Sequence, residues 1–271
     1  MNICFIGGGN MATALIGGLL QQKVFSANEL SVVEKSSEAR GRLQSQFGVH
    51  AFETIAQGIL GSEVIILAVK PQQLFEVCEQ LSPLLTGQLI ISIAAGVRAC
   101  DISRWLNTPD IVRCMPNTPA LIQSGVTGLY ALPGVNPARR EIAEGILRGV
   151  GNTLWVEQET MLDAVTAISG SGPAYVFYFI DALQQAAQQL GFNEESARLL
   201  AVETFLGAAK LAKCSDVSVS ELRTRVTSKN GTTERALLSL AANQVAEHIV
   251  EAALAADARS REMGDELGRA S

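Results

Sequence analysis

Residues 2–12 read N-I-C-F-I-G-G-G-N-M-A, and this stretch decides the fold at the start of the chain. Asn2–Ile6 predicts a short buried strand, and the residues after Ala12 suit a helix that packs through small side chains. The spacing fits the dinucleotide fingerprint: Gly7 permits the tight turn, Gly9 lets the backbone approach a pyrophosphate, and Ala12 allows close packing. The helix would offer free N–H groups to the phosphates. We therefore predict a nucleotide site, with a plain strand–turn–helix as the alternative.

More strand patterns follow through the first half of the chain, with helical segments between them. They are Leu30–Val33, Glu63–Val69, Gln88–Ile93 and Ile111–Arg113. The run E-V-I-I-L-A-V is continuously apolar, as expected of a strand buried on both faces. Strands that alternate with helices form a parallel sheet with right-handed crossovers. The sequence predicts an α/β Rossmann domain with a mostly parallel sheet.

In such sheets ligands lie beyond the carboxyl ends of the strands, so the loops there are the expected cofactor contacts. After the second strand, Glu34 would suit the ribose 2′-OH of NAD, whereas Lys35 and Ser36 would suit a 2′-phosphate, and both coenzymes stay open. Taken alone, Lys70 reads as a surface lysine and Pro71 as a helix starter. The predicted cofactor-binding residues are Gly7, Gly8, Gly9, Asn10, Met11, Glu34, Lys35, Ser36, Ala68, Val69, Lys70, Pro71, Ala94, Ala95, Gly96, Met115, Pro116 and Asn117.

Composition excludes several classes of partner. The 271 residues carry a net charge of −6, which argues against nucleic acid but allows a small anion at a local positive site. The five scattered cysteines form no C-x-x-C pair, so we expect reduced thiols in a cytoplasmic protein and no metal site. Neither a signal peptide nor a membrane span is predicted.

The pattern changes to helices from about Thr160. One apolar helical pattern ends at Gly191, and the next runs from Glu194 to about Lys213 with apolar residues around most of its circumference. A helix of that kind needs burial on more than one side. We predict a Rossmann domain over 1–157 and an all-helical domain over 158–271 that forms a homodimer, with burial against the first domain as the alternative.

Five segments together resemble the pyrroline-5-carboxylate reductase family. They are I-G-G-G-N-M-A at 6–12, A-V-K-P-Q at 68–72, R-C-M-P-N-T-P-A at 113–120, D-A-V-T-A-I-S-G-S-G-P-A-Y at 163–175 and L-R-T-R-V-T-S-K-N-G-T-T-E-R-A-L at 222–237. The resemblance implies hydride transfer from NADPH, or NADH, to the C=N bond of 1-pyrroline-5-carboxylate, which gives L-proline in the last step of proline biosynthesis. It also implies a Rossmann domain followed by a helical dimerisation domain, sometimes in rings of dimers.

The resemblance further implies a substrate site where a helix begins after residue 230. A helix N-terminus can bind the substrate carboxylate without an arginine. Thr233 would lie beside the imine nitrogen, and the family's Ser-Pro-Gly-Gly is replaced here by S-K-N-G, in which Asn tolerates positive φ. On spacing alone the segment reads as an N-cap, with Asn230 as the cap and Glu234 in the first turn. The implied catalytic residues are Ser228 and Thr233, and the implied substrate-binding residues are Asn230, Gly231, Thr232, Thr233, Asp216 and Glu159.

The inventory of acids is compatible with that chemistry. The only histidines are His50 and His248, and neither lies in a candidate motif. A carbonyl reductase normally needs a positioned acid, whereas an imine can enter already protonated. Two alternatives remain at this stage: a β-hydroxyacid dehydrogenase-like oxidoreductase that uses Lys70, and a non-catalytic dinucleotide-binding regulator.

Overall fold

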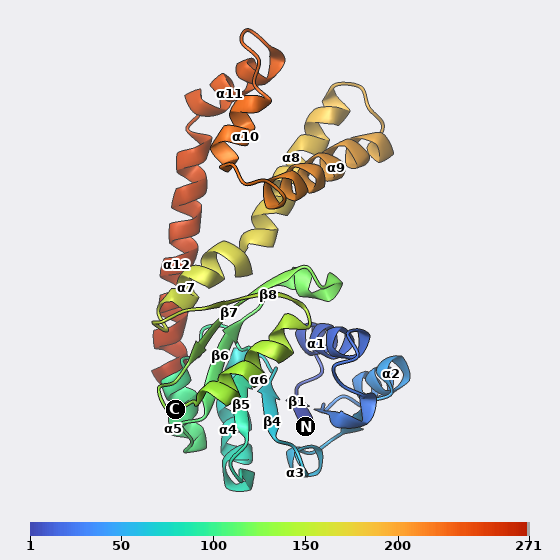
Figure 1. The fold of residues 1–271 in the computed structure, drawn as a ribbon, viewed down its shortest axis with the longest axis vertical. Coiled ribbons are helices and arrows are strands. Elements are labelled where there is room, and N and C mark those ends of the chain that lie inside the picture. The colour runs from blue at the N-terminus through green and yellow to red at the C-terminus, as the bar shows by residue number, and fades with distance from the viewer. Residues whose placement is uncertain (270–271) are drawn as a thin grey trace. The chain divides into compact units, whose positions relative to one another are not determined.

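The computed structural model describes residues 1–269 (Figure 1). The chain divides into two compact units. Unit 1 contains residues 1–171 together with the chain from Ala255 onward, and unit 2 is Gly172–Leu254. In the described residues no helix is both long enough and apolar enough to cross a membrane.

Unit 1 is built on one eight-stranded sheet in the order β3-β2-β1-β4-β5-β6-β7-β8. Neighbouring strands are parallel except at β6 and β7, which are antiparallel. The order from β3 to β6 is that of a Rossmann fold, so the predicted fold class is confirmed. The strands are β1 Ile3–Ile6, β2 Leu30–Val33, β3 His50–Phe52, β4 Val64–Leu67, β5 Leu89–Ser92, β6 Ile111–Met115, β7 Gly125–Ala131 and β8 Gly151–Trp155.

Helices cover both faces of this sheet and bury two separate cores. Along β1, Ile3 and Phe5 belong to one core, and Cys4 and Ile6 belong to the other. Side chains of a strand point alternately to its two faces, so a strand between two helical layers must be apolar throughout. The helices of unit 1 are α1 Asn10–Gln21, η1 Ala27–Glu29, α2 Ser37–Phe47, α3 Ile55–Gly58, η2 Pro71–Gln73, α4 Leu74–Leu81, η3 Ser82–Leu84, α5 Ala99–Leu106, η4 Thr118–Ile122, α6 Pro137–Arg148, α7 Met161–Val165 and the π-helical turn η5 Thr166–Gly170.

Unit 2 is entirely helical. Its elements are α8 Gly172–Gln189, α9 Glu194–Lys213, α10 Val219–Arg225, α11 Thr232–Ala242 and the first part of α12 Val245–Arg269. The predicted span of α9 is confirmed, and Gly191 follows α8 with a φ of +99°, a conformation that glycine adopts easily. Only Ala187 is buried in α8, and only Ala197 and Ala201 in α9.

Helix α12 leaves unit 2 and ends within unit 1. There Ser260 donates a buried hydrogen bond to Asp163 of α7 at 2.7 Å, and Asp265 pairs with Arg98 at the start of α5. The predicted domain boundary after residue 157 lies just beyond β8. The compact units divide after residue 171 instead, because α7, η5 and the end of α12 all belong to the same unit as the sheet.

Candidate active site

The turn between β1 and α1 has the shape that the glycine spacing predicts. Gly7 has a φ of +104°, and a Cβ placed there would lie 2.7 Å from the carbonyl oxygen of Ala68. Its amide donates to the carbonyl of Val33 at 2.8 Å, so the turn joins three adjacent strands. A side chain at this position would be both strained and crowded.

Gly9 serves the turn in another way. It is the N-cap of α1, and a Cβ placed on it would meet no atom within 4 Å. Gly9 and Asn10 are exposed, and the first amides of a helix have no acceptor within the helix itself. The open space and the free amides fit a pyrophosphate on the N-terminus of α1.

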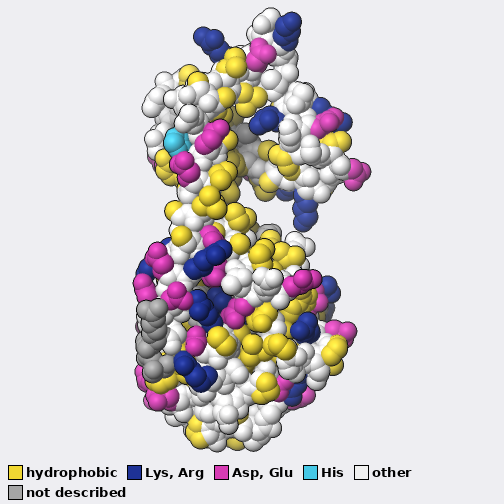
Figure 2. Space-filling model, turned by 90° about the vertical axis from the view of Figure 1, so that its left-hand side faces the viewer, with side chains coloured by type: hydrophobic (Ala, Val, Ile, Leu, Met, Phe, Trp, Pro, Cys, Tyr) yellow, Lys and Arg dark blue, Asp and Glu magenta, His cyan; other side chains and the backbone are white. Residues whose placement is uncertain are grey.

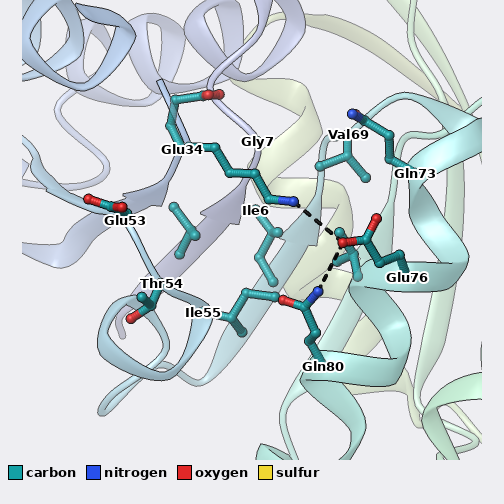
Figure 3. A pocket seen from close by; sticks show the side chains of 13 residues that line it. Ile6, Gly7, Glu34, Glu53, Thr54, Ile55, Val69, Gln73, Glu76 and Gln80 are labelled. Carbon is teal, nitrogen blue, oxygen red and sulfur yellow. Dashed lines mark hydrogen bonds and ion pairs between the residues drawn. The ribbon is translucent and has the colours of Figure 1, made fainter. Parts of the chain in front are cut away.

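A cavity of about 510 Å³ opens beside this turn (Figure 3). Apolar side chains of β2, α3 and α4 form much of its wall, and Glu34 and Lys35 lie at its edge. This is the place where a Rossmann fold receives the adenosine half of a dinucleotide. The lining residues are Ile6, Gly7, Val33, Glu34, Lys35, Glu53, Thr54, Ile55, Val69, Gln73, Glu76, Val77 and Gln80.

Glu34 is fixed by two backbone amides. Its Oε2 accepts from Gly8 at 2.9 Å and its Oε1 from Ser36 at 2.9 Å. Each carboxylate oxygen can accept more than one hydrogen bond, so Glu34 can still accept from a ribose hydroxyl. The Ser36 hydroxyl caps α2 by accepting from the Ala39 amide at 3.3 Å.

The other predicted cofactor loops differ in exposure. Lys70 is exposed, and Pro71 begins the 3-10 turn that leads into α4. Gly96, by contrast, is buried: a Cβ there would lie 3.3 Å from both Met263 and Leu267 of α12. The observed neighbour of Gly96 is therefore a helix of the protein itself.

The loop after β6 is tied to the π-helical turn η5. Asn117 donates to the carbonyl of Ser169 at 3.1 Å and accepts from the Val126 amide at 2.9 Å. A Cβ on Gly170 would lie 2.6 Å from Cε of Met115, so the two segments touch. Single π-helical turns interrupt helices frequently at functional sites. The glycines of this segment are visible in the sequence, but the π-helical turn was not predicted.

In unit 2, α11 begins as the resemblance implies. Gly231 is its N-cap. Asn230 has a φ of +58°, the positive φ that asparagine was expected to tolerate at this position. Glu234 accepts from the Asn230 amide at 2.8 Å, which secures the loop from inside the helix. No acceptor among the described residues takes up the amides of Thr232 and Thr233.

The two predicted acidic residues have different surroundings. Glu159 accepts from the guanidinium of Arg113 at 2.9 Å and from the Ala99 amide at 2.6 Å, all within unit 1. Arg113 is only 3% exposed, so Glu159 compensates a buried charge. Asp216 is exposed in unit 2, between α9 and α10.

The side of the cavity formed by Glu53, Thr54 and α4 was not predicted from the sequence. Glu53 and Thr54 follow β3, a strand too short to stand out as a pattern. The sequence did carry a signal for α4. Polar residues recur there at the spacing of one helical face, at Gln73, Glu76 and Gln80, and could have indicated the face that lines the cavity.

The sheet order and the glycine turn define a dinucleotide-binding Rossmann protein with an added helical unit. The family model for pyrroline-5-carboxylate reductase dimerisation matches residues 159–263, and that for coenzyme F420-dependent NADP oxidoreductase matches residues 2–96. The pyrroline-5-carboxylate reductase of Pseudomonas aeruginosa is 46% identical, over 98% of each chain.

Solved structures agree with these matches. The pyrroline-5-carboxylate reductase of Coxiella burnetii has a TM-score of 0.91 and 42% identity, over 97% of this chain and 98% of that one. The Plasmodium falciparum enzyme, solved with NADP bound, has a TM-score of 0.88 and 28% identity, over the same shares. The chain belongs to the pyrroline-5-carboxylate reductase family.

Proposed function

We propose that the protein reduces the C=N bond of 1-pyrroline-5-carboxylate to give L-proline, the last step of proline biosynthesis. The observation that carries this proposal is the beginning of α11, where the amides of Thr232 and Thr233 have no acceptor in the described chain. A reductase of an imino acid needs a site for the substrate carboxylate in addition to its dinucleotide-binding fold. Family membership supports the same assignment.

In this proposal the chain binds and orients the substrate. The amides of Thr232 and Thr233, with the hydroxyl of Ser228, hold the substrate carboxylate at the positive end of the α11 dipole. Gly231 shapes this site as the N-cap, because its own amide already donates to the carbonyl of Ser228 at 3.0 Å. Asn230 shapes the loop by its positive φ. With its acidic end fixed, the ring presents one face of the C=N bond.

The coenzyme, when bound by the predicted residues of unit 1, would supply the hydride that reduces the ring carbon of C=N, with the π electron pair left on nitrogen. Because the imine enters as an iminium, its nitrogen already carries the proton that the product amine retains. The hydroxyl of Thr233 accepts a hydrogen bond from that N–H, which orients the iminium and favours its charged form. Asp216 adds a negative charge to this side of the site.

We give Glu159 a supporting role in place of the predicted substrate contact. Its carboxylate already holds Arg113 and the Ala99 amide. The substrate contacts that we propose are thus all in unit 2, at residues 228–233 and Asp216.

We propose NADP(H) as the coenzyme, with NAD(H) possible, on the basis of the relative with NADP bound and the fit of the α1 turn. Its contacts would be the predicted residues from Gly7 to Asn117, including Ala68, Ala95 and Pro116. We further propose that unit 2 forms a homodimer, that dimers assemble into rings, and that the protein acts in the cytoplasm. The free cysteines support the assignment to the cytoplasm. The net charge of −6 supports a small-molecule partner rather than nucleic acid.

The test is turnover of 1-pyrroline-5-carboxylate with NADPH and with NADH, followed by loss of nicotinamide absorbance. Thr233→Val preserves shape and removes the hydroxyl, and we expect kcat/KM to fall about 10- to 100-fold. Thr227→Val, on the loop before α11, is the control. Turnover of a 2-keto acid but not of the imine would favour a hydroxyacid dehydrogenase, and coenzyme binding without either would favour a regulator.

A further inference from the structure

The cavity beside the glycine turn has an unusual balance of charge. Glu34, Glu53 and Glu76 contribute three carboxylates to its lining, while Lys35 is the one lysine or arginine among its described lining residues. Arg40 lies nearby but is already engaged: it donates to Glu53 at 3.0 Å and to the carbonyl of Glu34 at 2.8 Å. The positive charge available to an incoming phosphate is therefore that of Lys35.

Lys35 is paired with a carboxylate from the opposite wall. Its Nζ lies 3.5 Å from Oε1 of Glu76 on α4, and the same oxygen accepts from Nε2 of Gln80 at 3.2 Å (Figure 3). Gln80 thereby holds the Glu76 carboxylate toward the cavity. Lys35 is attached beside Glu34, at the end of β2, where the adenosine ribose of a dinucleotide is expected.

We propose that Glu76 determines coenzyme selectivity by competing with the ribose 2′-phosphate for Lys35. NADP(H) must draw Lys35 away from Glu76 and bring its phosphate charge toward the carboxylates of Glu34 and Glu76, whereas Glu53 is already paired with Arg40. NAD(H) needs neither change, because its free 2′-hydroxyl can donate to the anchored carboxylate of Glu34. The pocket then accepts both coenzymes, and Glu76 weakens the binding of the phosphorylated one. This proposal rests on the coenzyme site proposed above.

The size of the effect follows from exposure. The side chains of Lys35 and Glu76 are 77% and 62% exposed, so water screens their attraction and the pair is easily opened. We therefore expect Glu76→Gln to strengthen NADP⁺ binding about two- to fivefold, without changing NAD⁺ binding. Added salt should shrink the difference, because it screens exposed charges.

The experiment is titration calorimetry of the full-length protein with NADP⁺ and with NAD⁺, which differ only in the 2′-phosphate. Glu76→Gln should raise the ratio of NADP⁺ to NAD⁺ affinity, and Lys35→Gln should lower it. Glu79→Gln is the matched control: it removes the same charge from the same helix, at an exposed position outside the cavity lining, and should leave the ratio unchanged.

Two results would overturn the proposal: an unchanged ratio in Glu76→Gln, whether neither affinity changes or both change equally, or the same rise in Glu79→Gln. Turnover of 1-pyrroline-5-carboxylate is measured separately. Loss of the selectivity effect with intact turnover would remove only the role of Glu76. A clear selectivity effect in a protein that does not reduce the imine would remove only the proposed reaction.

Discussion

Gly7 and Gly9, two residues apart, are glycines for different physical reasons. Gly7 needs its φ of +104° and has a backbone carbonyl where a Cβ would stand. Gly9 has a φ of −72°, which any residue adopts, and space around its Cβ position. The first glycine is required by the fold, and the second leaves room for a ligand.

We expect Gly7→Val to destabilise unit 1, whereas Gly9→Val should fold with an unchanged melting temperature and bind NADP⁺ at least about tenfold more weakly. Thermal unfolding and calorimetry on both variants provide the check. If Gly9→Val bound the dinucleotide normally, the pyrophosphate would not lie on this turn.

Burial divides the five cysteines into two groups. It raises the pKa of Cys4 to about 11 and that of Cys78 to about 12, and it also raises the pKa of Cys114. Cys100 and Cys214 are exposed, and partial burial, with the nearby carboxylates of Asp101 and Glu159, also raises the pKa of Cys100. A raised pKa keeps a thiol protonated until the pH approaches that value, so at pH 8 roughly one in a thousand Cys4 groups is ionised.

A thiol reagent at pH 8 should therefore modify at most Cys100 and Cys214 in the folded protein, and all five cysteines after denaturation. Mass spectrometry of digested, labelled protein identifies the sites. Rapid labelling of Cys78 in the native protein would show that the core around α4 opens readily.

At the scale of elements, one buried hydrogen bond joins α12 to α7. Ser260 and Asp163 are 5% and 8% exposed, and their hydrogen bond is 2.7 Å long. Ser260→Ala would leave the Asp163 carboxylate buried without this donor. We expect a loss of about 1–3 kcal/mol in the free energy of unfolding.

Urea denaturation measures that loss, and Ser239→Ala, at an exposed position of α11, is the control. Asp163→Asn should cost less, because a neutral amide can still accept from Ser260 and needs less solvation. A Ser260→Ala variant as stable as the parent would mean that water or another donor replaces the serine hydroxyl.

Elements with a strong local pattern could be predicted from the sequence, and elements defined by distant partners could not. The strands β1, β2, β4, β5 and β6 and the helix α9 agree closely with their patterns. β7 and β8 continue the sheet beyond a change of strand direction, and β3 is only three residues long. The glycine turn could also be predicted from the sequence. The pairing of Lys35 with Glu76 could not, because only the folded sheet brings these two residues together.

At the scale of the whole molecule, unit 2 leaves many large apolar side chains uncovered. Figure 2 shows hydrophobic side chains among the charged ones on the surface of the helices. Exposed apolar area of this extent, in helices such as α8 and α9 that bury few residues, indicates an interface. Members of the set include Phe177, Tyr178, Leu199, Leu206, Leu238 and Leu254.

We expect the protein to sediment as a homodimer or larger, and Phe177→Glu to shift the distribution toward monomer, because it places a charge in apolar surroundings. Gln188→Glu adds the same charge at an exposed polar position of α8 and should leave the distribution unchanged. A parent protein that is monomeric at micromolar concentration would contradict a helix-mediated assembly.

The last helix also affects how the protein is made. Because α12 supplies Ser260, Met263 and Asp265 to the unit that contains the glycine turn, unit 1 completes its contacts only after α12 has been synthesised. Domains usually fold in order during translation. A released fragment that ends at residue 171 should leave Arg98, Asp163 and Gly96 without these partners, and protease digestion of the fragment should reveal an incompletely folded nucleotide-binding half.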